Sequence, residues 1–344
     1  MIKTKDLLTL TQIQSRVAWL AGKPGAAMGL SEAKTAGTVC AGPTKENICA
    51  IVVTYFPDAH FGERLDRIRS QVGKTIIIDN TGDPYPGALS QPMNSADIEI
   101  IRNKQNVGIG AALNQGVSRV MQLGYEWAIT FDQDSWIHLD LVNILISIYA
   151  QQPRPELVGI IGCNFEDGNT HVPLMRCLPG APIFREIESV ITSGSLLSVT
   201  TFSKAGPFRS DFFIDFVDHE YCLRLLQLGY KVIISTAPLM VHALGTANLF
   251  SLNSRAGSWL LVLTNRSPLR RYYMTRNGLL VARRYFTVAP KWVLKSLASL
   301  LIFAVLKIPW EEGARKKKFC ATLYGAFDAL RSRSGKARAA WLEK

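Results

Sequence analysis

The stretch Ala128-Ile129-Thr130-Phe131-Asp132-Gln133-Asp134-Ser135 has the character of a hydrophobic strand that ends in two carboxylates with one residue between them. Side chains on an extended strand alternate between its two faces, so Asp132 and Asp134 can point the same way from the strand end. A divalent cation or a polyphosphate could bridge them there. A polar turn after a core strand has the same pattern, so the flanking sequence must decide between a site and a turn.

The chain before and after this stretch alternates apolar runs with helical patterns. Apolar runs typical of strands in a parallel sheet occur at 48–55, 75–80, 98–101, 126–131, 158–162 and 232–234, and helical patterns at 60–71 and 109–123. This order predicts a doubly wound α/β domain, in which ligands bind beyond the carboxyl ends of the strands. Asp79 and Asp132 both stand at such ends. A carboxylate leaves water there only if a ligand, a metal or a backbone donor compensates it.

Several other kinds of site are excluded by spacing. Gly108-Ile109-Gly110 precedes a helix as in a dinucleotide-binding turn, but the third glycine of that fingerprint would fall at Leu113. No GxxxxGK[ST] phosphate loop occurs. The six cysteines are scattered without a CxxC pair, so neither a zinc site nor a disulfide framework is predicted, and they fit a reducing compartment. The polar run Thr9 to Arg16 would interrupt a secretory signal, so no export signal is expected.

The positive charge is concentrated in the last quarter of the chain. The formal net charge is +12, yet residues 266–344 hold 18 Lys or Arg against 4 Asp or Glu, whereas residues 1–265 hold 21 against 23. A uniformly basic nucleic-acid domain would not have this distribution, so no nucleic-acid partner is predicted. A near-neutral enzyme with a basic tail that meets anionic lipid fits it better, and a nucleic-acid-binding tail stays an alternative.

The same region carries apolar segments that are too short to cross a bilayer. The uncharged core between Lys295 and Lys307 has eleven residues, and it is flanked by Trp292 and Trp310. With the basic run 315–318 and a second amphipathic segment at 319–330, the pattern predicts helices that lie in a membrane interface. A helical cap packed on the preceding domain and an oligomer interface are the alternatives.

Ordered motifs around the paired carboxylates make the chain recognisable. They are Val52-Val53-Thr54-Tyr55 with Pro57, Ile78-Asp79-Asn80, Asn106-Val107-Gly108 with Asn114 and Gly116, and Phe131-Asp132-Gln133-Asp134-Ser135. In this order and spacing, the chain resembles the inverting family 2 glycosyltransferases of GT-A fold, and most closely their bacterial rhamnosyltransferase branch. The resemblance implies a Rossmann-like mixed α/β sheet flanked by helices and followed by a C-terminal amphipathic helical extension.

The resemblance also implies a donor site at the strand ends. It places Thr54, Tyr55 and Asp79 around the nucleobase, Asp132 near the ribose, and Asp134 on a divalent cation, Mg²⁺ or Mn²⁺, which neutralises the diphosphate leaving group. Members of the family often have a metal- or diphosphate-contacting histidine where this chain has His242, although a lone histidine beside apolar residues is usually structural. The other donor-binding residues that the resemblance implies are Asn106, Gly108, Asn114, Gln133, Arg276 and Asn277.

Two later segments are implied to serve the acceptor and the chemistry. Ser193-Gly194-Ser195 resembles the segment beside the sugars, although a small-residue turn explains it nearly as well. In the acidic cluster that follows, the family usually has Glu-Asp, whereas this chain has Val217 and Asp218, so Asp218 is the expected general base at the start of a helix over 218–229. Asp215 or Glu220 could share the task of the missing carboxylate, and both are expected near the acceptor.

Residues 267–277 resemble a signature of the rhamnosyltransferase branch. Within it, Arg276-Asn277 is the expected diphosphate contact, in preference to Arg270 and Arg271, because arginines make charge-assisted contacts with such groups.

The sequence therefore predicts three parts: an N-terminal extension (1–47), a GT-A catalytic domain (48–265) and a basic, membrane-associating helical region (266–344). The predicted activity is metal-dependent, inverting transfer of L-rhamnose from dTDP-L-rhamnose to a lipid-linked or polysaccharide acceptor, in the synthesis of O-antigen or another cell-surface polysaccharide. The protein is expected in the cytoplasm, at the inner face of the cytoplasmic membrane, as a monomer or an oligomer. The alternatives are another UDP- or dTDP-sugar donor, or a non-catalytic nucleotide-sugar-binding or membrane scaffold protein.

Overall fold

The computed structural model describes residues 42–83, 96–177, 180–242, 247–254, 257–310 and 313–342. Residues Cys40–Lys344 form one compact unit. Most of the extension predicted for residues 1–47 lies outside the described residues, and only residues 42–47 of it are described.

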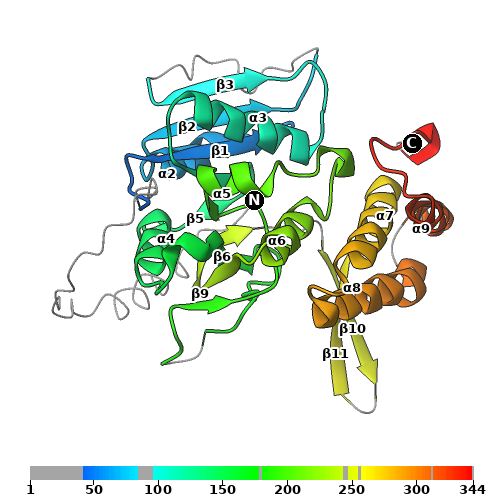
Figure 1. Cartoon of the computed structure of the whole chain (residues 1–344). Helices are drawn as coiled ribbons and strands as arrows, with labels where there is room; N and C mark the ends of the chain where they lie inside the picture. Colours follow the sequence, from blue (N-terminus) through cyan, green and yellow to red (C-terminus); the bar gives the residue numbers. More distant parts are fainter. Residues whose placement is uncertain are drawn as a thin grey trace. The chain divides into compact units, whose positions relative to one another are not determined.

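The first half of the central sheet is parallel. Its strands run in the order β3-β2-β1-β4, with bounds β1 Ile48–Thr54, β2 Lys74–Asp79, β3 Ile98–Arg102 and β4 Trp127–Asp132. Helices α2 (Phe61–Arg69) and α3 (Ile109–Gln122) connect them (Figure 1). Every residue of β1 is buried, as its unbroken apolar run predicts for a strand covered on both faces.

The second half makes the sheet mixed. The order continues β4-β8-β6-β9-β5, in which β8 (Ser195–Ser198) is antiparallel to both neighbours, and β5 (Trp136–Ile137) pairs antiparallel with the end of β9. Strands β6 (Val158–Asp167) and β9 (Lys231–His242) pair in parallel and extend well beyond the predicted 158–162 and 232–234. Their second halves were not predicted because the parallel register between them is irregular and their burial is incomplete there. The short β7 (Phe184–Glu186) pairs with β9.

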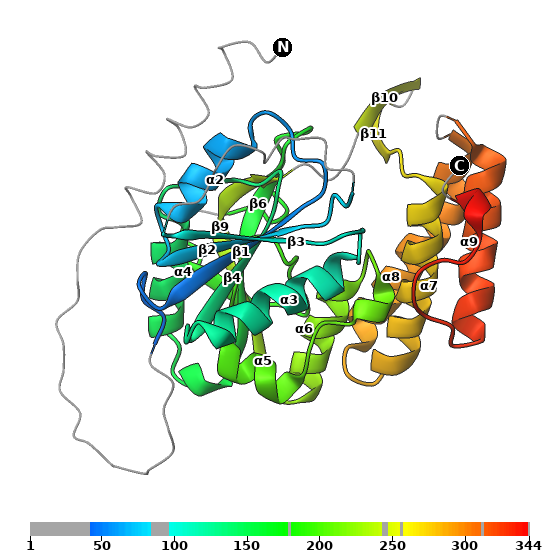
Figure 2. The same ribbon diagram turned by 90° about the horizontal axis from the view of Figure 1, so that it is seen from above.

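Helices cover both faces of this sheet, as the doubly wound prediction requires. On one face Ile51 packs in a core cluster with Val117 of α3 and Leu223 of α6 (Val217–Gln227). On the other face Val52 packs with Leu65 of α2. Figure 2 shows α3, α5 (Val199–Ala205) and α6 on one side of the sheet and α2 on the other, and α4 (Leu141–Ala150) joins the core of the α2 face.

The chain then leaves the sheet for a hairpin and three helices. Strands β10 (Ala247–Ser254) and β11 (Gly257–Thr264) form a separate antiparallel hairpin, followed by α7 (Pro268–Tyr285), α8 (Pro290–Ile302) and α9 (Arg315–Leu330). The hydroxyl of Ser267 accepts a hydrogen bond from the Arg270 amide and caps α7, and Pro268 occupies its first turn. Short helical turns are Pro155–Leu157, Ser210–Phe212, Phe303–Lys307, Ile308–Trp310 and Ala340–Leu342.

None of the described helices combines the length and the apolar character that a bilayer crossing demands. Lys318, which belongs to the basic run that the sequence assigned to a membrane surface, is buried, and its ammonium group donates to the side-chain oxygen of Asn265 at 2.5 Å.

Candidate active site

Two aspartates and a histidine meet at one edge of the sheet. Asp132 ends β4, Asp134 follows two residues later, and His242 ends β9, whose last residues pair with β5. The Nδ1 atom of His242 lies 3.3 Å from Oδ1 of Asp134, and its Nε2 atom lies 3.9 Å from Oδ2 of Asp132. One ligand atom from each residue can be chosen so that all three atoms lie within 4.8 Å of one another. The three residues that the sequence placed at or after strand ends therefore lie close together.

The electrostatics of this acid–histidine cluster favour a bound cation. Burial, the field of Asp134 and the field of Asp218 raise the pKa of Asp132 to about 6, against the attraction of His242. Burial also acts to raise the pKa of Asp134, but the hydrogen bond and the charge of His242, with smaller contributions from a backbone amide and Arg64, together outweigh it and leave this pKa below the usual value. Two carboxylates and an imidazole, incompletely enclosed, are a donor set that Mn²⁺ or Mg²⁺ accepts once diphosphate oxygens complete it. The residues present therefore fit a divalent cation.

The small-residue segment lies beneath this cluster. The hydroxyl of Ser193 accepts a hydrogen bond from the Asp132 amide at 3.1 Å and lies 2.6 Å from the hydroxyl of Ser135. Gly194 has φ +72°, and a Cβ there would lie 2.3 Å from Sγ of Cys163. Ser195 is buried and donates to the carbonyl of Ile191. Ser193 and Ser195 are 0% exposed, so the structure places them as supports of the paired carboxylates rather than as an open sugar surface.

The carboxyl ends of β1 and β2 form a second polar group. Asp79 is buried, and its Oδ1 accepts from the hydroxyl of Thr54 at 3.2 Å and from the Thr81 amide at 3.0 Å. Tyr55 is half exposed beside it. The side chain of Gln133 accepts from the Tyr55 amide at 2.6 Å and donates to the Tyr55 carbonyl at 3.0 Å. Gln133 therefore ties the loop after β1 to the paired carboxylates, and it brings these two groups together.

The turn before α3 packs against the loop that precedes α6. Asn106 accepts a hydrogen bond from the Gly108 amide at 2.9 Å, and Gly108 has φ +86°. A Cβ on Gly108 would lie 2.6 Å from the carbonyl oxygen of Phe213, so only glycine allows this approach. Asn114 bonds in both directions with the backbone of Phe208, at 2.9 Å each way. The structure gives Gly108 and Asn114 packing roles that position later segments.

The loop before α6 carries two of the predicted acidic residues. Asp215 accepts two hydrogen bonds from Arg270, from its Nη2 at 2.6 Å and from its Nε at 3.3 Å. Asp218 lies in the first turn of α6 and is 21% exposed, and its Oδ1 accepts from the His219 amide. Because the charge of Asp218 helps to raise the pKa of Asp132, the two carboxyls are within electrostatic range. Helix α6 begins one residue before the predicted start, at Val217.

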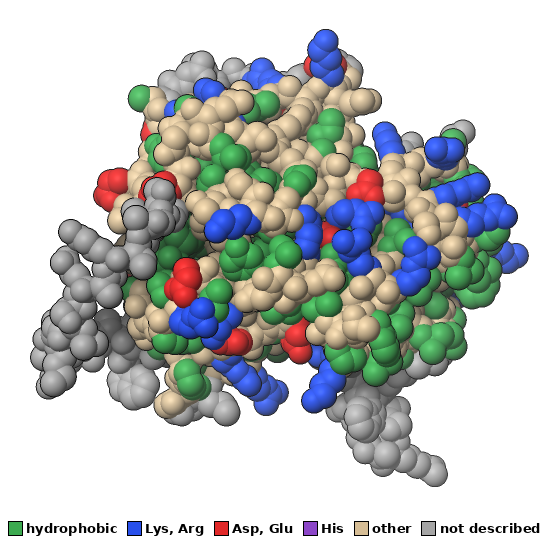
Figure 3. All heavy atoms as spheres, viewed as in Figure 1, with side chains coloured by type: hydrophobic (Ala, Val, Ile, Leu, Met, Phe, Trp, Pro, Cys, Tyr) green, Lys and Arg blue, Asp and Glu red, His purple; other side chains and the backbone are tan. Residues whose placement is uncertain are grey.

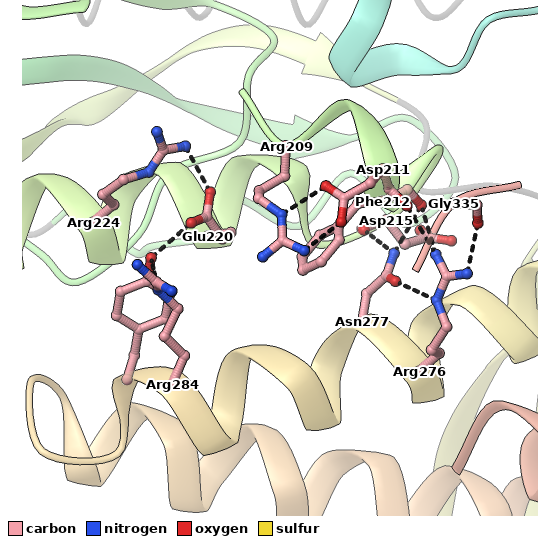
Figure 4. Close-up of polar contacts among 11 residues, drawn as sticks. Arg209, Asp211, Phe212, Asp215, Glu220, Arg224, Arg276, Asn277, Arg284 and Gly335 are labelled. Atoms are coloured by element: carbon pink, nitrogen blue, oxygen red, sulfur yellow. Dashed lines mark hydrogen bonds and ion pairs between the residues drawn. The ribbon is translucent and has the colours of Figure 1, made fainter. Parts of the chain in front are cut away.

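Other expected residues lie away from the cluster. Glu220 is 2% exposed and accepts from Tyr285 of α7 at 2.6 Å and from Arg224 at 2.8 Å, so it joins α6 to α7 (Figure 4). Arg276 and Asn277 are buried and bond to backbone carbonyls. This burial argues against the diphosphate contact that the sequence assigned to Arg276 and Asn277.

Arg270, which the sequence ranked below Arg276 as a diphosphate contact, lies within the electrostatic range of Asp132 and Asp218. Burial acts to lower its pKa, but the fields of Asp215, Asp132 and Asp218 raise it above the usual value. Arg266 lies near it, and burial together with the charge of Arg270 lowers the Arg266 pKa.

Comparison with known proteins agrees with this architecture. Residues 49–205 match the model of the glycosyl transferase family 2. A dTDP-rhamnosyl transferase, RfbF, from Shigella flexneri is 29% identical over 255 residues, which are 69% of this chain and 80% of that protein.

Two solved glycosyltransferase structures are similar to this chain. The structure of GalNAc-T7 with UDP, GalNAc and Mn²⁺ has a TM-score of 0.53 at 10% identity, over 83% of this chain and 57% of the other. The mannosyltransferase PcManGT from Pyrobaculum calidifontis, with GDP-Man and Mn²⁺, has a TM-score of 0.49 at 14% identity over 95% of each chain. The comparisons thus identify residues 49–205 as a glycosyl transferase family 2 domain, set in a mixed sheet with the fold of a solved glycosyltransferase structure.

Proposed function

We propose that this glycosyltransferase is metal-dependent and inverting, and that it transfers L-rhamnose from dTDP-L-rhamnose to a lipid-linked or polysaccharide acceptor in the synthesis of a cell-surface polysaccharide such as O-antigen. The observation that carries this proposal is the acid–histidine cluster of Asp132, Asp134 and His242, with Asp218 and Arg270 in its electrostatic range. At one edge of the sheet, this arrangement combines a site for a divalent metal ion, a carboxylate that can act as a base (Asp218) and a guanidinium that can bind a phosphate group (Arg270).

The donor half of the site is proposed as follows. Asp79, Thr54 and Tyr55 bind the nucleobase, because the carboxylate of Asp79 can accept a ring N–H at the edge of the sheet. Asp134 and His242 hold Mg²⁺ or Mn²⁺ with Asp132, and the cation, when bound, neutralises charge on the leaving diphosphate. Arg270, with Arg266 beside it, binds the same diphosphate, because the N–H donors of a guanidinium fit phosphate oxygens.

The acceptor half of the site centres on Asp218. Its carboxylate takes the proton of the acceptor hydroxyl as that oxygen attacks the anomeric carbon from the face opposite the diphosphate. The bond to the diphosphate breaks in the same displacement, so the configuration at the anomeric carbon inverts. Asp215 cannot serve equally well as the base, because Arg270 already holds its two carboxylate oxygens.

The choice of dTDP-L-rhamnose is supported by the relative from Shigella flexneri, whose name states a dTDP-rhamnosyl donor. The test is release of nucleoside diphosphate from dTDP-L-rhamnose, UDP-glucose and GDP-mannose, each with and without Mn²⁺. Metal-dependent release from dTDP-L-rhamnose alone is the expected result. Release from the UDP- or GDP-sugar in its place would overturn the donor assignment and keep the enzyme class.

The acceptor and the location are proposed from the surface of α8 and α9. Helix α9 packs its small residues Ala321, Gly325 and Ala329 inward, whereas large apolar side chains are exposed along its outer face, namely Phe319, Leu323, Phe327 and Leu330. Helix α8 and the turn after it likewise expose Leu294, Leu301, Ile302 and Val305. Figure 3 shows hydrophobic side chains gathered over the place of α8 in Figure 1, with Lys and Arg side chains on the α9 side.

Such an outward apolar stripe beside cations fits the interface of an anionic membrane. We therefore propose a peripheral enzyme at the inner face of the cytoplasmic membrane, with a catalytic domain at 48–265 and a membrane-associating region at 266–344. A lipid-linked saccharide would meet the active site from that surface. A second copy of the chain covering the same stripe is the alternative occupant.

A further inference from the structure

Two consecutive residues of α7 hold the loop that leads into α6. This α6 entry loop (residues 211–216) carries Asp215 and ends directly before α6, in whose first turn Asp218 lies. Asn277 is 0% exposed, and its Nδ2 donates to the carbonyls of Phe212, Ile214 and Asp215 at 3.0, 2.9 and 2.9 Å. The amide has two N–H groups, so three carbonyls share them. Figure 4 shows the amide pointing from α7 into the loop.

Arg276 completes the hold. Its Nε donates to Oδ1 of Asn277 at 2.9 Å, which fixes the direction of that amide. Its Nη2 donates to the carbonyls of Asp211 and Phe212 at 3.2 and 3.4 Å, and its Nη1 donates to the carbonyl of Gly335 at 2.6 Å. The Gly335 amide in turn donates to the Asp211 carbonyl at 2.6 Å. A residue near the C-terminus thus joins the same network.

The loop needs these partners because its backbone is strained. Phe213, Asp215 and Phe216 have φ of 63°, 63° and 64°, a region that residues with a Cβ avoid. Such a conformation is unfavourable and persists only where its surroundings hold it. The conformation also turns the loop carbonyls toward α7, where each buried carbonyl requires a donor. Arg276 and Asn277 supply donors to four of the six carbonyls between Asp211 and Phe216.

We propose that Arg276 and Asn277 are positioning residues for the chemical step, which place the carboxylate of Asp218 by fixing the α6 entry loop. The inference rests on the proposed role of Asp218 as the base. The donor-binding ends of β1, β2 and β4 are held by other contacts, among them those of Gln133 and Ser193. Loss of the hold therefore lowers turnover and leaves donor binding in place.

The test compares full-length Asn277→Asp and Arg276→Lys with Thr275→Ala. Asn277→Asp keeps the shape of the side chain and removes its donors, and Arg276→Lys keeps the charge and removes the fork. Thr275 is the control because the hydrogen bond that its hydroxyl donates stays within α7, to the Arg271 carbonyl. The readouts are dTDP release from dTDP-L-rhamnose with water as the acceptor, dTDP binding with Mn²⁺ by calorimetry, and hydrogen exchange of residues 211–218.

The expected result is a loss of up to about 10²-fold in kcat, a KM and a dTDP affinity close to the control, and faster exchange confined to residues 211–218. Gly335→Ala gives a second, milder variant, because φ of +92° strains an alanine while its Cβ meets no atom within 4 Å. Folded variants that keep control values of kcat, or that lose kcat and dTDP affinity together, would overturn the proposal. If the control itself releases no dTDP, the donor assignment has failed. Hydrogen exchange of residues 211–218 in the Arg276 and Asn277 variants then decides the proposal: faster exchange supports fixation of the α6 entry loop by these two residues, and unchanged exchange overturns it.

Discussion

Arg270 donates two hydrogen bonds to Asp215, so the first turn of α7 is joined to the loop that precedes the proposed base. The same guanidinium lies within the field of Asp132 and Asp218. Asp215 is its hydrogen-bond partner, whereas Asp132 and Asp218 act on it through their charge. A diphosphate at the cation site would offer it oxygens of the same charge and similar geometry.

Arg270→Gln should weaken binding of dTDP with Mn²⁺ by about tenfold or more, because a hydrogen bond to a charged group contributes about 1.5–3 kcal/mol. Titration calorimetry measures the change. Arg283→Gln is the matched control, since it removes the same charge from an exposed position on the same helix. Equal affinity in the two variants would assign Arg270 a purely structural role toward Asp215.

Asp134→Asn should abolish metal-dependent nucleotide binding, because a neutral amide binds a hard cation much less well than a carboxylate. The measurement is the dTDP-induced rise in melting temperature with Mn²⁺ and with EDTA. Asp140→Asn, at a position whose side chain makes no cap hydrogen bond, should keep the difference between Mn²⁺ and EDTA. Retention of that difference in Asp134→Asn would remove this residue from the cation site.

Asp218→Asn should keep donor binding while transfer falls by about 10²–10⁴-fold, the usual contribution of a general base. The amide keeps the shape of the side chain and cannot take the proton of the acceptor hydroxyl. Rates of dTDP release and dTDP affinities give the two readouts. Asp215→Asn and Glu220→Gln are the comparisons, and if one of them shows this signature while Asp218→Asn turns over normally, the base is that residue.

Replacing Leu323 and Phe327 by serine should reduce flotation with vesicles that contain anionic lipid, because both side chains are exposed on α9. Salt should weaken flotation of the wild type, since each Lys or Arg near such a surface contributes about 1 kcal/mol only while screening is modest. Serine at Met121 and Leu139, exposed apolar residues of the catalytic domain, is the control. Unchanged flotation, with a change in oligomeric state, would favour a second copy as the occupant.

Gly194→Ala should lower the free energy of unfolding by about 1–3 kcal/mol more than Gly124→Ala, as expected for overpacking. Both glycines have φ near +75°, so the backbone strain is matched. Only at Gly194 does the new Cβ meet an atom, Sγ of Cys163 at 2.3 Å, whereas none lies within 4 Å at Gly124. Urea denaturation measures the difference, and equal values would show that the Cys163 side chain moves aside.

The features that follow from local pattern were predictable from the sequence. The apolar run 48–55 predicted β1 within one residue of its observed end, and the carboxylates Asp79 and Asp132 lie at strand ends as expected. The match of residues 49–205 agrees with the predicted family over that segment, and the mixed sheet and the structural comparison confirm the predicted fold. An apolar run indicates that a strand is buried, and a central strand of a sheet is buried whatever its particular neighbours are, so such strands can be predicted from local sequence.

The surroundings of individual polar residues could not be predicted in this way. Arg276 lies over the rings of Tyr272 and Tyr273 and bonds to carbonyls more than fifty residues away along the chain. The sequence of α7 does not distinguish it from Arg270, because both are arginines on a weakly amphipathic helix. Ser193 likewise resembled a sugar-binding residue, and only the pairing of β8 with β4 buries its hydroxyl beneath Asp132.

The antiparallel pairing of β5 with the end of β9 has a consequence for stability. It brings Trp136 opposite Val241 and so sets the loop after β4 beside His242, although Ser135 and His242 are 107 positions apart along the chain. A divalent cation shared by the two aspartates and the histidine would close a long loop of chain in the manner of a cross-link. The metal cofactor of the reaction would then also stabilise the fold as a reversible cross-link between the ends of β4 and β9.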